Sequence, residues 1–141
     1  MFGAGTIMTE SHFQLLLHAA RSQPEPQRLL FVFAAAALPA DASAEQKVRF
    51  QAGEGGELDP VMCVAKDPDL LTSFDALAAE SGGTGQDWRV VFVAGLSGHG
   101  RSVPTESQIE QALNEMVEAV RRGNTGRYAA YDARGAPLSF S

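Results

Sequence analysis

Cysteine and long apolar runs are scarce in this chain, and their scarcity excludes several classes of protein. Cys63 is the single cysteine among 141 residues, so the chain has no internal disulfide and no four-cysteine metal site. No uninterrupted apolar stretch reaches the ~20 residues that span a bilayer. We therefore expect a soluble protein of a reducing compartment, the cytoplasm, with no membrane partner.

Positive charge is also in short supply. Eleven Lys and Arg stand against seventeen Asp and Glu, which gives a formal net charge of −6, and the basic residues are scattered along the chain. A negative protein without a basic stripe repels a phosphate backbone. We expect no nucleic-acid partner.

Histidine is too sparse and too dispersed to indicate a metal site. Of the three histidines, His12 and His18 are six residues apart, which places them on nearly opposite sides of a helix. The carboxylates lie mostly on the surfaces of expected helices, as Glu110, Glu115 and Glu118 do. We expect no metal, no cofactor and no catalytic residue, which favours a protein that is not an enzyme.

What the sequence does have is the apolar content of one globular domain. Apolar residues make up 45% and charged residues 20% of the chain, which is ordinary for a domain of this size. Residues 1–10 lack the charged and apolar regions of a signal peptide, and we expect a disordered or frayed tail there. Residues 11–141 are expected to form a single α/β domain.

Helix boundaries are indicated by capping residues, glycine and proline. Ser or Thr followed three residues later by Gln is typical of a capping box, and it begins three of the expected helices. Asp67 before Pro68 predicts the start of another helix, with Leu70 on its apolar face. The last helix carries an apolar stripe for three turns before Gly123 ends it. The expected helices cover residues 11–22, 43–50, 67–81 and 105–122.

Strands are indicated by short continuous apolar runs, which suit strands covered on both faces. Three runs cover residues 29–33, 61–64 and 90–94, of which the third is the most apolar and is expected to be central. Residues 128–131 and 137–140 predict a hairpin with Gly135 at a left-handed turn position. Cys63, inside the second run, is expected to be buried and unreactive.

These elements predict an α/β fold: a single-layer mixed sheet of about five strands, packed with three or four helices and ending in a C-terminal β-hairpin. The connection between the first two strands is long enough for a parallel crossover. Its glycine-rich exit equally allows an antiparallel return. Both arrangements stay open.

The most informative segment is the glycine-rich loop over residues 95–101. It follows the third strand and precedes a helix, where open α/β sheets bind ligands, and its exposed amides can hold an anion while Arg101 adds charge. If the three strands run parallel, Asp41 and Asp67 join it in one cleft. The candidate ligand-binding residues are Ser97, Gly98, His99, Gly100, Arg101 and Asp67.

The loop matches no established motif in full. It lacks the Gly-Lys-Ser/Thr of a phosphate-binding loop, and four residues separate Gly100 from the expected helix start at Thr105. It has His99 where a nucleophile elbow has glycine, and no later histidine completes a triad. A plain flexible connector is the alternative interpretation.

Two functional hypotheses follow from these observations. The first is a small non-catalytic interaction or accessory domain, whose partner is another protein or a second copy of the chain. The second is a domain that binds a small anionic molecule, or an enzyme, using residues 95–101. Binding of an anion separates them, because a ligand at a hundredfold over its dissociation constant stabilises a protein by ~2.7 kcal/mol.

Several segments, among them residues 23–33, 53–56, 61–64 and 85–94, carry a family resemblance. They resemble a small proteobacterial family that often bears the label ribonucleotide reductase alpha subunit. Such a subunit needs a radical-bearing cysteine and a redox-active cysteine pair, whereas this chain has Cys63 alone, so no active-site residue is carried over. The order of helix and strands is also similar to SseB-like domains, which implies antiparallel pairing of the first two strands.

Overall fold

Five strands form one sheet, in which each strand runs antiparallel to its neighbours. The computed structural model describes residues 11–38, 41–51, 57–82 and 87–138, and within them the strand order is β2-β1-β3-β4-β5. The strands are β1 Gln27–Ala37, β2 Glu57–Lys66, β3 Val90–Ser97, β4 Ala129–Asp132 and β5 Pro137–Leu138. The helices are α2 His12–Arg21, α3 Ala44–Gln51, α4 Phe74–Gly82 and α5 Glu106–Arg121.

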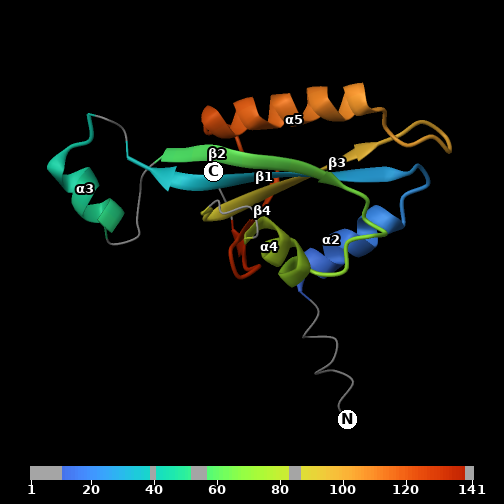
Figure 1. The fold of residues 1–141 in the computed structure, drawn as a ribbon, viewed down its shortest axis with the longest axis horizontal. Coiled ribbons are helices and arrows are strands. Elements are labelled where there is room, and N and C mark those ends of the chain that lie inside the picture. The colour runs from blue at the N-terminus through green and yellow to red at the C-terminus, as the bar shows by residue number, and fades with distance from the viewer. Residues whose placement is uncertain (1–10, 39–40, 52–56, 83–86, 139–141) are drawn as a thin grey trace, which may run out of the picture.

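Helices cover both faces of the sheet. Figure 1 shows α5 along one face and α2 with α4 along the other. Side chains of β1 alternate between the two cores: Phe31 and Phe33 pack in the cluster with α2 and α4, whereas Val32 packs in the cluster with α5. Coverage on both faces is the reason why β1 and β3 are continuous apolar runs.

The expected α/β fold with about five strands is therefore confirmed, and β3 is central as expected. Its pairings with β1 and with β4 are antiparallel, as is that of β1 with β2. The sequence analysis expected a mixed sheet, whereas the described strands pair only in the antiparallel direction. A parallel arrangement of the first three strands is wrong.

Helix α5 and the C-terminal hairpin form as predicted. Thr105 and Gln108 make a reciprocal capping box at the start of α5, and Gly123 follows its end with a φ of 73°. The stripe of α5 packs on the sheet through Ile109, Leu113, Met116, Val117 and Val120. In the hairpin, Gly135 has a φ of 88°, the left-handed conformation that glycine adopts without strain.

Helix α4 begins later than predicted. Asp67 caps no helix; its carboxylate accepts a hydrogen bond from the amide of Asp69 at 2.9 Å, and its carbonyl accepts one from the amide of Leu70 at 3.0 Å. These bonds close a tight turn, after which the chain stays non-helical until Ser73 caps α4. Leu70, expected on an apolar helix face, is 81% exposed.

The prediction that Cys63 is buried is wrong. Cys63 is exposed, because β2 is an edge strand that pairs only with β1. Its neighbours Met62 and Val64 pack against the core on the α4 side, whereas Cys63 alternates to the other face near the rim of the sheet.

Helix α3 extends the long β1–β2 connection beyond the layered body (Figure 1). Its described side chains, residues 44–49 and 51, are all exposed. The expected tail at residues 1–10, the glycines at 53–56 and the end of the last expected strand at 139–140 lie outside the described residues. In the part of the chain that is described, none of the helices combines the length and the apolar character that crossing a bilayer requires.

Candidate functional site

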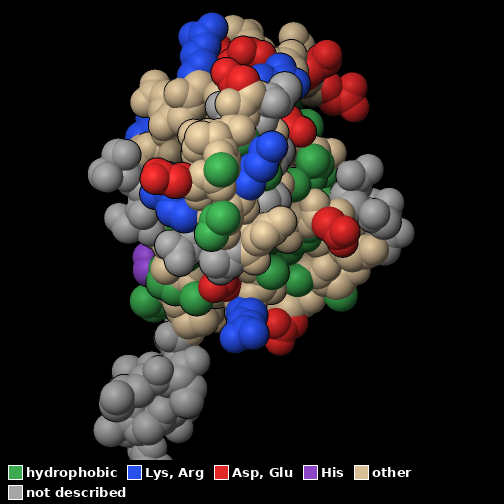
Figure 2. All heavy atoms as spheres, turned by 90° about the vertical axis from the view of Figure 1, so that its left-hand side faces the viewer, with side chains coloured by type: hydrophobic (Ala, Val, Ile, Leu, Met, Phe, Trp, Pro, Cys, Tyr) green, Lys and Arg blue, Asp and Glu red, His purple; other side chains and the backbone are tan. Residues whose placement is uncertain are grey.

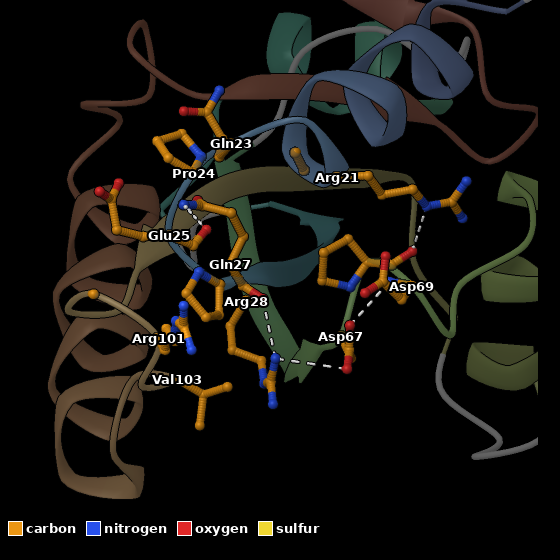
Figure 3. Close-up of a pocket in the computed structure, with 14 residues that line it drawn as sticks. Arg21, Gln23, Pro24, Glu25, Gln27, Arg28, Asp67, Asp69, Arg101 and Val103 are labelled. Atoms are coloured by element: carbon orange, nitrogen blue, oxygen red, sulfur yellow. Dashed lines mark hydrogen bonds and ion pairs between the residues drawn. The ribbon is translucent and has the colours of Figure 1, made fainter.

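A pocket of about 400 Å³ opens at the end of the sheet where β1 begins and where β2 and β3 end (Figure 3). Three connections form its walls: the α2–β1 turn, the β2–α4 turn and the β3–α5 loop. Its lining residues are Ala20, Arg21, Gln23, Pro24, Glu25, Pro26, Gln27, Arg28, Asp67, Pro68, Asp69, Gly100, Arg101 and Val103.

Antiparallel pairing brings these connections together. Leu29 of β1 pairs with Lys66 at the end of β2, and Gln27 pairs with Ser97 at the end of β3. Asp67 and the loop after β3 therefore meet at one end of the sheet, although the parallel arrangement from which the sequence analysis expected this is wrong. Asp41 follows β1 and lies toward the opposite end, so the prediction that it joins the cleft is wrong.

The proline-rich turn before β1 is fixed to the end of β3. The carbonyl oxygen of Pro26 accepts a hydrogen bond from the amide of Gly98 at 2.9 Å. The side-chain amide of Gln27 donates to the hydroxyl oxygen of Ser97 at 2.7 Å. Because proline also fixes its own φ angle, this wall is rigid before any ligand arrives.

The wall formed by the β2–α4 turn is held by Arg21 of α2. Its guanidinium donates to the carbonyl oxygen of Pro68 at 2.9 Å and to that of Leu71 at 2.6 Å. Arg21 thus serves the fold, since two of its guanidinium nitrogens donate to backbone oxygens of this turn. It positions the turn that carries Asp67 and Asp69.

Two other guanidinium groups remain available to the pocket. A guanidinium nitrogen of Arg28 lies 3.7 Å from a carboxylate oxygen of Asp67, and the two side chains are 23% and 32% exposed. That separation exceeds a hydrogen bond, and a pair this exposed contributes little stability. Arg101 makes no hydrogen bond or ion pair with any residue that the structure describes.

The backbone amides of the loop do not form the expected cradle for an anion. The amide of Gly98 donates to Pro26, and the amide of His99 donates to the carbonyl oxygen of Ser102 at 3.0 Å. Ser102 returns the bond to His99 at 2.8 Å, which folds the loop tightly. Ser97 belongs to β3, as do residues 95 and 96.

The close approach of Gly98 to Ser102 explains why glycine stands there. A Cβ at position 98 would overlap the carbonyl oxygen of Ser102. Gly100 has a φ of 58°, a left-handed backbone conformation that glycine adopts without the steric cost of a Cβ atom. Both glycines therefore shape the loop.

Of the six candidate residues, the structure places three at the pocket: Asp67, Gly100 and Arg101. Ser97, Gly98 and His99 are not among its lining residues, although the first two anchor the loop. Sequence reasoning missed Arg28. In the sequence, Arg28 is a charged residue directly before an apolar run. That position predicts a place at the pocket only once β1 is known to run antiparallel to both of its neighbours.

No three or more His, Cys, Asp or Glu side chains are grouped so as to hold a metal ion within the residues described. Comparison with known proteins gives no match among family models, curated proteins or solved structures. The function therefore has to be inferred from the pocket itself.

Proposed function

We propose that this chain is a non-catalytic binding domain whose pocket takes a small ligand through an anionic group. The observation that carries the proposal is the position of Arg101, which lines the pocket without a hydrogen-bonding or charged partner in the described part of the chain. A guanidinium offers several donors in a planar fork that matches a carboxylate or phosphate.

Arg28 gives the anion a second contact. Figure 3 shows the guanidinium of Arg28 between Arg101 and Asp67, with Asp69 farther from Arg101. The lining contains three arginines and three carboxylates, so the pocket as a whole attracts neither sign. The attraction is local, at Arg101, which is unpaired among the described residues, and at Arg28, whose guanidinium donates to the carbonyl oxygen of Gln27 at 3.1 Å and lies 3.7 Å from Asp67.

Calorimetric titration with phosphate, sulfate and simple carboxylates tests the proposal. We expect the Arg101→Ala variant to bind the anion about tenfold more weakly, which corresponds to ~1.4 kcal/mol. This loss is at the lower end of the range for a hydrogen bond to a charged group, because the side chain of Arg101 is exposed. Folding stability should stay nearly unchanged.

The control is Arg134→Ala. Arg134 is exposed in the β4–β5 turn, after the strand residue Asp132, which pairs with Val90 at the start of β3, so it lies at the opposite end of the sheet. Equal affinities of the two variants, or the absence of binding with every anion, would overturn the proposal.

A second candidate function is self-association through α3. Among its described side chains α3 carries exposed Glu45, Lys47 and Arg49, a local excess of one positive charge in a chain of net charge −6. The exposed side of α5 carries Glu106, Glu110, Glu115 and Glu118. This charge complementarity favours α3 of one copy lying against α5 of another.

The face of the molecule at the α3 end carries both signs of charge. Figure 2 shows basic and acidic side chains interspersed there, without a patch of one sign. Self-association through specific ion pairs fits such a surface better than attraction to a uniformly charged polymer.

Light scattering over a concentration series tests this second candidate. The wild type should associate, and the double variant Lys47→Glu, Arg49→Glu should not. A monomer at all concentrations would overturn this second candidate.

A further inference from the structure

We infer that the ligand of the pocket is an organic anion, in which an apolar group is joined directly to the charged one. The inference rests on the proposed function and adds to it the chemical class of the ligand. Inorganic phosphate or sulfate would then occupy only part of the site.

The first argument is volume. A pocket of about 400 Å³ lies in the range of roughly 300–1,000 Å³ that small-molecule sites occupy. A tetrahedral oxyanion has only five heavy atoms, so bound at the arginines it fills only part of that space. The rest of the ligand must be matched to the remaining walls.

The second argument is the chemistry of those walls. Val103 lines the pocket beside the two arginines (Figure 3), and its side chain is 47% exposed. Pro24, Pro26 and Pro68 line it too, and proline presents apolar ring carbons. An alkyl or aryl group bound there would remove this apolar surface from water.

The third argument is the rigidity of the apolar walls. The carbonyl of Pro26 is bonded to the end of β3, and the carbonyl of Pro68 is bonded to Arg21. Walls held in this way lose little conformational freedom when a ligand binds. Shape can therefore select the apolar group, while Arg101 selects the charge.

The test is a homologous series measured by calorimetry on the full chain. Inorganic phosphate is compared with methyl, ethyl, propyl and butyl phosphate. Acetate is compared with pentanoate, so that the two series show whether the site prefers a phosphate or a carboxylate group. Affinity should rise roughly twofold per methylene, which corresponds to half of full burial. Butyl phosphate should then bind about eightfold more tightly than methyl phosphate.

The matched variants are Val103→Thr and Val48→Thr, which are close in shape to the wild type. Val48 is 65% exposed on α3, away from the pocket lining. In Val103→Thr the rise in affinity along the series should be halved or lost, while inorganic phosphate binds as in the wild type. In Val48→Thr the series should be unchanged.

The outcomes separate this inference from the proposed function. If inorganic phosphate and all alkyl phosphates bind equally, the pocket binds anions but the inference is wrong. If the rise persists in full in Val103→Thr, the alkyl group meets the proline walls, and the assignment of its contact to Val103 is overturned. If no anion of either series binds, the proposed function itself fails.

Discussion

The Nδ1 atom of His12 lies 2.7 Å from the hydroxyl oxygen of Tyr131. This hydrogen bond joins the first turn of α2 to β4 across 119 residues of sequence. The ring of Tyr131 is fully buried, and the ring of Phe13 meets it edge to face, with centroids 5.5 Å apart. Burial disfavours the charged phenolate and raises the pKa of Tyr131 to about 12.

The raised pKa predicts a loss of stability in alkali. Tyr131 keeps its proton in the folded protein up to about pH 12, whereas in the unfolded chain it ionises near pH 10.0. The contribution of the protonated Tyr131 to the free energy of unfolding is therefore complete below pH 10, and it is lost as the pH rises through 12. Between pH 8 and pH 11 the wild type should lose about 1.4 kcal/mol more than Tyr131→Phe. Urea unfolding of both proteins checks this, and parallel pH profiles would contradict it.

Removal of side-chain volume from α5 should separate buried from half-buried positions. Met116 is 2% exposed within the core beneath α5, so Met116→Ala should lower the free energy of unfolding by ~2–5 kcal/mol. Leu113 is only partly buried, and Leu113→Ala should cost less. Gln111→Ala, on the exposed side of the helix, should change stability by under about 0.5 kcal/mol. Chemical denaturation measures all three, and a reversed order would show that α5 packs differently.

Cys63 should react in the native protein. Its side chain is exposed on the edge strand β2, so no unfolding has to precede modification. Labelling by a thiol-reactive disulfide reagent at neutral pH should proceed at a rate similar to that in urea. Protection that is released only by denaturant would mean that β2 is covered in solution.

Substitutions of two glycines should have opposite effects. A methyl group at Gly98 meets the backbone of Ser102, which has no flexible atom to move aside, so Gly98→Ala should cost about 1–3 kcal/mol. Gly82 ends α4 with open space around its Cα, and Gly82→Ala should be neutral or stabilising by up to ~1 kcal/mol. Thermal unfolding of the two variants gives the comparison. A tolerated alanine at position 98 would show that the loop relaxes.

The elements that sequence predicted well are those with local signals. The capping box of Thr105 and Gln108 forms within four residues, and the apolar stripe behind it needs no knowledge of the partner. The start of α4 was mispredicted because its determinant is distant. Arg21 donates hydrogen bonds to the carbonyl oxygens of Pro68 and Leu71, which are 47 and 50 residues away in the sequence. The turn at Asp67 therefore prevails over the helix that the local pattern favours.

The same distinction explains the site. Asp67 and Arg101 were candidates because each follows an apolar run, which the sequence shows directly, and the structure places both at the pocket. Arg28 precedes one, and only the pairing of Gln27 with Ser97 brings it to the same end of the sheet. Exposure of Cys63 was missed because an apolar run does not reveal whether its strand has one neighbour or two.

The pairing of β1 with β3 has a consequence during synthesis. Gln27 and Ser97 are 70 residues apart, so β1 can pair with β2 well before its other partner has left the ribosome. Throughout that interval the unpaired backbone edge of β1 is open to other nascent chains, and long-range pairing of this kind forms slowly. The step that completes the central sheet is thus also the step that closes the pocket at its end, so a chain interrupted before β3 has neither.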